Sequence, residues 1–170
     1  VFQEDAVFPW MTVSQNIQFG MKGGGAARAG AVAEYLSLVE LEDVAKKYPR
    51  ELSGGMRKRV DVARALASEA SLILMDEPFS ALDTNTKRRL HRDFQFWIER
   101  KGRTVLFVTH DIEEALWLSD RVVVVGGRPA SICAEYVSGW PRPRRADLVY
   151  DQDFVDLRRE IEQNIFLDRK

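Results

Sequence analysis

The sequence predicts an α/β fold with a parallel sheet at its core and a helical part that precedes this sheet in the chain. Apolar runs at residues 71–78 and 104–110 have the length and composition of buried strands. A polar stretch with helical spacing, residues 85–101, lies between them. A strand, a helix and a strand at this spacing form a βαβ unit, in which the two strands run parallel. The first 50 residues are instead mostly helix and loop.

The helical part is expected to begin with a strand end and a loop at residues 1–10. Thr12 or Ser14 can cap a short helix that ends at Gly20, and residues 20–30 form a linker rich in Gly and Ala. Further helices are expected at 31–41 and 42–48, before Pro49.

Smaller elements follow the second strand. They are a helix at 112–119, two strands around a Gly-Gly turn within 120–137, a basic linker with two prolines at 141–147, and an amphipathic helix at 153–166. We therefore divide the chain into three parts. These are a helical part at 1–67, an α/β part at 68–138, and the linker with the last helix at 139–170.

Composition and charge restrict the class of protein. The chain has 170 residues, and its 25 Lys and Arg against 26 Asp and Glu give a net charge of −1, which argues against a nucleic-acid binder. The single cysteine, Cys133, excludes an intrachain disulfide framework and fits a reducing compartment; we expect it to be a small buried residue. No apolar run is long enough to cross a bilayer, so a membrane role would come through a partner.

A Ser-Gly-Gly turn that opens a helix, Ser53-Gly54-Gly55, is suited to hold a phosphate. Free backbone N–H groups at such a turn point outward, and the helix dipole favours an anion. The G-x-x-x-x-G-K-[ST] loop that usually cradles nucleotide phosphates is nevertheless absent from the sequence. The turn therefore indicates half of a phosphate site.

The strand at 71–78 ends in two carboxylates, Asp76 and Glu77. At the carboxyl edge of a parallel sheet the first can hold Mg²⁺, and the second can orient or deprotonate an attacking water. A strand-end turn with two solvated acids is the plain alternative. His110 ends the next strand, so it should arrive near these carboxylates, although a histidine at such a place is more often structural. Asp83 is expected to cap the helix that follows.

The helix after Ser53 carries two sets of residues. Those expected to face the core are Met56, Val60, Ala63 and Leu66. Those expected on the other, solvated faces are Arg57, Lys58, Arg59 and Arg64.

Taken in order, the loop with Gln3 and the runs LSGGMRKRVDVARAL, LILMDEPFSALD and VTHD resemble the ATP-binding subunits of ABC transporters over nearly the whole chain. The resemblance implies an ABC-type P-loop NTPase domain that uses ATP and Mg²⁺. It also implies a role for each matching residue. These are Gln3 as the Q-loop glutamine that touches Mg²⁺ and water, Ser53, Gly54 and Gly55 as the signature turn, Asp76 as the Walker B aspartate on the metal, Glu77 as general base, Asp83 as the D-loop aspartate and His110 as the switch histidine.

In this family the signature turn closes over ATP held by the Walker A loop of a second ATPase subunit, identical or different. The resemblance therefore implies a dimer with composite sites. It also leads us to expect that the chain is the C-terminal part of a longer ATPase, with the Walker A loop upstream, and that these 170 residues alone are inactive.

The segment FPWMTVSQNI, residues 8–17, is similar to the importer branch of the family, where it receives a helix of the membrane permease. Phe8, Trp10 and Met11 would be the exposed apolar contacts, with local packing as the alternative. The hairpin and the C-terminal region resemble the ATPases of nitrate, sulfonate and taurine importers. The resemblance implies transmembrane permease subunits, indirectly a solute-binding protein, a peripheral place on the cytoplasmic face of the plasma membrane, and no nucleic acid.

Three residues of the signature helix depart from the family pattern. Lys58 and Met56 stand where Gln is common, and Asp61 stands where a small apolar residue is usual. We expect Lys58 and Asp61 to alter surface pairing without loss of chemistry. Two other functions stay open: a soluble ABC ATPase with no transport role, and a module that donates the signature turn without hydrolysing ATP.

Overall fold

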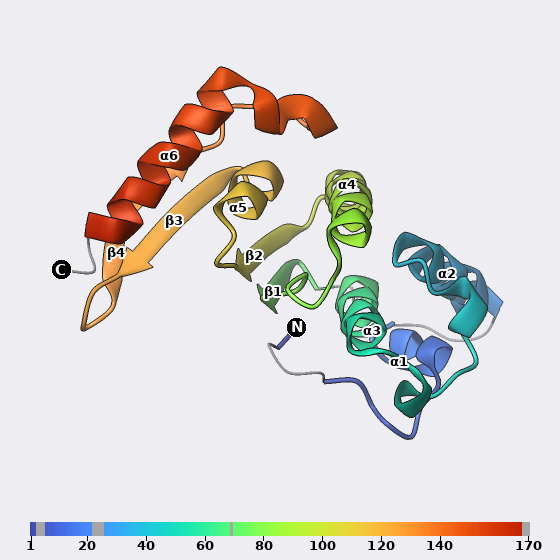
Figure 1. The fold of residues 1–170 in the computed structure, drawn as a ribbon. Coiled ribbons are helices and arrows are strands. Elements are labelled where there is room, and N and C mark those ends of the chain that lie inside the picture. Colours follow the sequence, from blue (N-terminus) through green and yellow to red (C-terminus); the bar gives the residue numbers. More distant parts are fainter. Residues whose placement is uncertain (3–5, 22–25, 69, 168–170) are drawn as a thin grey trace. The chain divides into compact units, whose positions relative to one another are not determined.

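The computed structural model describes residues 1–2, 6–21, 26–68 and 70–167 (Figure 1). The chain forms two compact units, Val1–Val108 and Thr109–Lys170. The division into parts 1–67, 68–138 and 139–170 rests on motifs and stays a prediction.

The first unit contains the predicted βαβ unit. Strands β1 (Leu72–Asp76) and β2 (Thr104–Val108) are parallel neighbours, and helix α4 (Thr84–Lys101) connects them (Figure 1). The register runs from Leu72 opposite Thr104 to Asp76 opposite Val108. Its remaining elements are α1 (Val13–Phe19), α2 (Ala26–Leu38), the 3-10 turns η1 (Glu42–Val44) and η2 (Pro49–Glu51), and α3 (Gly54–Ala67).

Val1 occupies a third position in this sheet. The nitrogen of Val1 donates to the Leu74 carbonyl at 2.8 Å, and the Asp76 amide donates to the Val1 carbonyl at 3.0 Å. Bonds from one residue to positions j−1 and j+1 of its neighbour are the pattern of parallel pairing. The strand end predicted at the start of the chain is therefore present beside β1.

The start and end of α1 follow from local chemistry. The Thr12 hydroxyl accepts from the Gln15 amide, and the Gln15 side chain accepts in return from the Thr12 amide at 2.8 Å, which is a complete capping box. Gly20 ends the helix, as predicted. Helix α2 begins inside the predicted linker, and the helix predicted at 42–48 is only the short turn η1.

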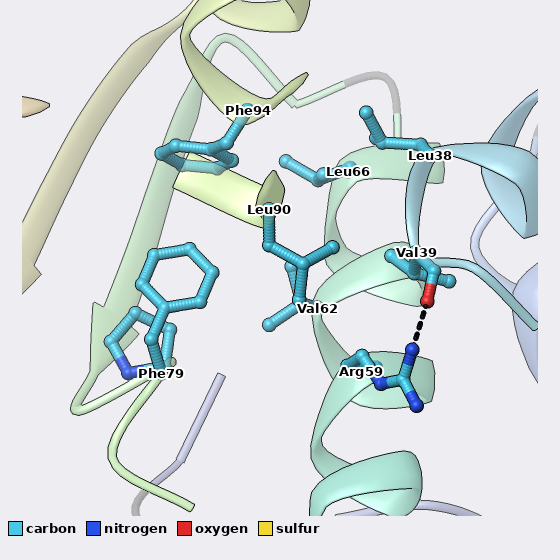
Figure 2. Close-up of a pocket in the computed structure, with 9 residues that line it drawn as sticks. Leu38, Val39, Arg59, Val62, Leu66, Phe79, Leu90 and Phe94 are labelled. Atoms are coloured by element: carbon cyan, nitrogen blue, oxygen red, sulfur yellow. Dashed lines mark hydrogen bonds between the residues drawn. The ribbon is translucent and has the colours of Figure 1, made fainter. Parts of the chain in front are cut away.

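The core of the first unit joins α2, α3 and α4 (Figure 2). A small apolar hollow there is lined mainly by Leu38, Val39, Val62, Leu66, Phe79, Leu90 and Phe94. At its rim the Arg59 guanidinium donates to the Val39 carbonyl at 2.8 Å and the Glu40 carbonyl at 3.2 Å, at the end of α2. Burial lowers the pKa of Arg59, and the attraction of Glu40 opposes that effect. The helical part and the βαβ part thus share one apolar core.

The predicted faces of α3 are only partly correct. Val60, Ala63 and Leu66 are buried as expected, whereas Met56 is half-buried. Lys58 is not on a solvated face: it is 2% exposed, because its ammonium group donates to the Phe2 carbonyl. None of the four basic residues of α3 is fully exposed.

The second unit is a hairpin with helices packed around it. Its elements are α5 (Ile112–Leu118), the antiparallel strands β3 (Arg121–Gly126) and β4 (Ser131–Val137), η3 (Ala146–Tyr150) and α6 (Gln152–Leu167). Helix α6 runs along the hairpin (Figure 1), and Phe154 of α6 is fully buried. Cys133 of β4 is exposed, so the prediction that it is buried is wrong; it lies at the irregularity of the hairpin register.

The basic segment predicted as a linker is packed against the end of α5. Arg144 is buried, and its guanidinium donates to the Trp117 carbonyl at 2.9 Å. Arg142 donates to the Leu118 carbonyl at 2.5 Å and to Asp120 at 2.9 Å. Cations are stabilised at a helix C-terminus, whose last carbonyls lack helical partners.

Within the described part of the chain, no helix is both long and apolar enough to span a membrane.

Candidate functional site

Strand β1 brings two adjacent carboxylates to the edge at which the parallel strands end. Asp76 is its last residue and is exposed, whereas Met75 is buried, as strand alternation requires. Asp76 pairs with Val108, the last residue of β2, so both strands stop at the same edge. Open α/β sheets bind their ligands at this edge.

Glu77 adopts a left-handed backbone conformation with φ at 47°. For a residue other than glycine this costs on the order of 1 to 3 kcal/mol, and such residues cluster at active sites. Hydrogen bonds hold it on both sides. The Glu77 amide donates to the Val108 carbonyl at 2.9 Å, and the Glu77 carbonyl accepts from the Ser80 hydroxyl at 3.0 Å. The strand therefore ends one residue before Glu77, and no feature of the local sequence predicts this strain.

The predicted phosphate turn is the N-terminus of α3. Ser53 is the N-cap, and its hydroxyl accepts from the Met56 amide at 3.2 Å. Gly54 is exposed. A Cβ on Gly55 would lie 3.0 Å from the Ala81 carbonyl oxygen and 3.3 Å from Leu82 Cδ2. Gly55 therefore lets the loop before α4 approach the first turn of α3.

Asp83 caps α4, as predicted. Its carboxylate accepts from the amides of Asn85 at 3.1 Å and Thr86 at 3.0 Å. Hydrogen bonds from the Thr86 side chain, and next from the Thr86 backbone, lower the pKa of Asp83. Because residues 81 and 82 pack on Gly55, the structure brings the loop before Asp83 and the Ser53-Gly54-Gly55 turn together.

His110 lies in the second unit, just before α5, and is exposed. Hydrogen bonds hold the residues on both sides of His110, Thr109 and Asp111. Asp111 caps α5 by accepting from the Glu114 amide at 3.1 Å, and the Thr109 hydroxyl is bonded to the buried Glu114 carboxylate. Sequence reasoning did not single out Glu114; an acid three residues after a capping Asp is the signal that could have found it. That His110 approaches Glu77 stays a prediction, and Gln3 lies outside the described residues.

One residue at this edge of the sheet fits a bound Mg²⁺. Mg²⁺ in such sites is bound by one or two carboxylates together with phosphate oxygens and water. Asp76, exposed at the edge of the sheet, can supply such a carboxylate.

A second feature of the first unit is an aromatic patch formed by Phe8, Trp10 and Phe19. Trp10 is 69% exposed and Phe19 is 62% exposed. The Phe8 ring lies between them, with centroids 5.5 Å from Trp10 and 4.6 Å from Phe19. Of the three residues expected as exposed contacts, Trp10 is exposed, whereas Phe8 and Met11 are half-buried. The exposure of Phe19 was not predicted.

Comparison with known proteins supplies a family. Residues 1–80 match the family model described as ABC transporter. The nitrate import ATP-binding protein NrtD of Synechocystis sp. is 45% identical over 144 residues, which cover 83% of this chain and 54% of that protein. The aliphatic sulfonates import ATP-binding protein SsuB of Bacillus cereus is 37% identical over 163 residues, covering 96% of this chain and 64% of that protein.

A solved structure agrees with these relatives. The ATP-binding cassette MJ0796, in a dimeric post-hydrolysis state bound to ADP and Pi, superposes with a TM-score of 0.71 at 32% identity. The match covers 83% of this chain and 62% of that one. The chain thus spans between about half and two thirds of the length of the proteins that it matches. The P-loop NTPase fold of ABC type predicted from the order of the motifs is confirmed.

Proposed function

We propose that the chain, whose residues 1–80 match the ABC transporter family model, is part of the ATP-hydrolysing subunit of an importer for nitrate, a sulfonate, taurine or a similar small solute. The observation that carries this proposal is the strained Glu77 directly after Asp76. A solvated turn would not need a conformation that costs free energy and is held by hydrogen bonds to the Val108 carbonyl and from the Ser80 hydroxyl.

The proposed reaction is in-line attack of water on the γ-phosphate of ATP. Asp76 would hold Mg²⁺, which neutralises charge on the phosphates. Glu77 accepts the proton of the attacking water, and His110 orients the water and the terminal phosphate. Gln3, at the proposed Q-loop, would contact both the metal and the water.

The signature turn serves the ATP of a second subunit. We assign Ser53, Gly54 and Gly55 to the γ-phosphate held by that subunit, where amide N–H groups and the dipole of α3 stabilise developing charge. Asp83 belongs to the same edge, because its loop packs on Gly55. The subunit therefore acts as a homodimer or heterodimer.

The aromatic patch is the proposed contact for the permease. Apolar side chains as exposed as Trp10 and Phe19, both packed against the ring of Phe8, suit a helix of a membrane protein that projects from the bilayer. Through the permease the subunit would lie on the cytoplasmic face of the plasma membrane, and a solute-binding protein would deliver the solute outside.

The test is ATP turnover by the complete native subunit, assembled with its permease. We expect Glu77→Gln to abolish turnover and leave ATP binding intact, because the amide keeps the volume but cannot accept the proton. Glu99→Gln, an exposed residue of α4, is the matched control and should hydrolyse ATP normally. Turnover by Glu77→Gln at the rate of the unmodified subunit would remove Glu77 from the mechanism. Absence of ATP binding by the unmodified subunit would overturn the function itself.

A further inference from the structure

The side chain of Arg64, in α3, lies against the aromatic patch. The guanidinium carbon of Arg64 lies 4.8 Å from the centroid of the Phe8 ring. A cation over the face of an aromatic ring at this distance is attracted by the ring quadrupole. Arg64 Nη1 is buried and has no hydrogen-bond partner within the described ranges. The contact with the face of the Phe8 ring therefore compensates in part for the burial of the guanidinium group.

The other side of the same guanidinium is fixed inside the protein. Arg64 Nη2 lies 2.6 Å from Asp61 Oδ1, one helical turn earlier in α3. The Asp61 side chain is 2% exposed and that of Arg64 is 16% exposed. Water screens a buried pair of this kind far less than a surface pair. Asp61 was expected to change surface pairing only; it is in fact the internal anchor of Arg64.

The backbone of Phe8 is held by α1, and α1 in turn packs on α3. Phe8 donates from its amide to the Asn16 side chain at 2.8 Å and accepts from the Asn16 amide group at 3.2 Å. A Cβ on Gly20 would lie 2.8 Å from the Arg64 carbonyl oxygen, so the end of α1 touches α3 at this residue. The patch therefore has little freedom to move without Arg64.

Helix α3 is a rigid connection between two ends of the first unit. Ser53 caps one end, and Arg64 lies 11 positions further along. At 1.5 Å per residue that is about 16 Å. Because α3 is continuous and a helix moves as a rigid element, a displacement at Arg64 also displaces the end at Ser53.

We propose that Arg64 is a positioning residue that couples the aromatic patch to α3, so that a membrane-protein helix docked on the patch alters the position of the Ser53-Gly54-Gly55 turn. This proposal rests on the proposed function, because both the docked helix and the phosphate at the turn belong to it. The link is specific to the planar guanidinium, which can lie on a ring and pair with Asp61 at once.

The test uses the complete subunit with its permease in lipid vesicles. The quantity measured is the stimulation ratio, the ATP turnover with permease divided by the turnover without it. Arg64→Lys keeps the charge beside Asp61 but loses the planar contact with Phe8, and Phe8→Leu removes the ring. We expect each to lower the ratio by about threefold or more, the size of a partly desolvated cation–π contact. The double variant should be no worse than either single one.

The control is Arg89→Lys. Arg89, in α4, forms an exposed ion pair with Glu40 at 2.7 Å, and this variant should leave the stimulation ratio unchanged. A role of Arg64 in folding alone would lower both rates together and preserve the ratio, and that result would overturn the proposal. Multiplied effects in the double variant would overturn it as well, since independent sites add in free energy.

A second measurement separates the two proposals. If the unmodified subunit hydrolyses no ATP with or without permease, the proposed function fails. The melting temperatures of the same four proteins then decide whether Arg64 and Phe8 are coupled. Additive shifts would show that Arg64 does not position the patch, and non-additive shifts would support the link.

Discussion

The backbone amide of Glu77 donates to the carbonyl of Val108 at 2.9 Å, across the ends of β1 and β2. This bond continues the ladder by one residue beyond β1, although the φ of Glu77 has already changed sign to 47°. The residue proposed as general base is therefore held by the sheet and not by a free loop. Its conformation is consequently a property of the fold, which can be tested without any nucleotide.

Replacing Glu77 by Gly should give a more stable protein than replacing it by Ala. In the left-handed region an L side chain costs about 1 kcal/mol or more, and Gly does not incur that cost. Urea unfolding of the complete subunit would measure the difference. Glu99, in regular α4, is the matched site, and there Ala should be more stable than Gly by about 1 kcal/mol. The same order of Ala and Gly at both positions would contradict the strain.

The two glycines of the Ser53-Gly54-Gly55 turn should respond differently to Ala. At Gly55 the new Cβ meets the Ala81 carbonyl oxygen at 3.0 Å, so the loop or the helix must shift, at about 1 to 3 kcal/mol. At Gly54 the nearest atom is the flexible end of Arg57 at 3.8 Å, so Ala should be tolerated or gain up to about 1 kcal/mol from helix propensity. Unfolding curves of the two variants check this, and equal stabilities would show that Gly55 has no packing role.

Much of the architecture could be predicted because its causes are local. The caps at Thr12 and Asp83, the stop at Gly20 and the two apolar strands each depend on a few neighbouring residues. The order of motifs also gave the family correctly. Part of the site could be predicted in the same way, because an apolar strand has to end near the two adjacent carboxylates Asp76 and Glu77.

What could not be predicted depends on partners distant in the chain. Lys58 is buried because the Phe2 carbonyl, 56 residues away, accepts a hydrogen bond from its ammonium group, and helical spacing carries no such information. The sequence around Arg144 predicts a linker, whereas in the structure this residue donates a hydrogen bond to the carbonyl of Trp117, 27 residues earlier in the chain. The φ of Glu77 is set by the sheet that surrounds it. In each case tertiary contact overrides the tendency of the local sequence.

The Asp83 carboxyl should titrate below its ordinary pKa of about 3.9, because the Thr86 hydroxyl and amide stabilise the charged form. A pKa depressed in the folded state means that Asp83 stabilises the fold above the unfolded pKa, and that this contribution is lost as the pH falls through the folded pKa. Carboxyl carbon NMR against pH would follow the titration. Thr86→Val removes the leading cause, so the midpoint should rise; an unchanged midpoint would show that Thr86 is not responsible.

Arg144 should be one of the most sensitive positions of the second unit. Its side chain is completely buried and bonds the Trp117 carbonyl at 2.9 Å. Arg144→Met would leave that carbonyl without its donor, and we expect a loss of about 1.5 to 3 kcal/mol in unfolding free energy. The neighbouring Arg145, with a side chain 68% exposed, pairs with Asp147 and Asp151 in solvent. Arg145→Met should therefore cost at most about 1 kcal/mol. Urea unfolding of both variants provides the comparison, and equal losses would mean that the segment after Trp140 is a linker after all.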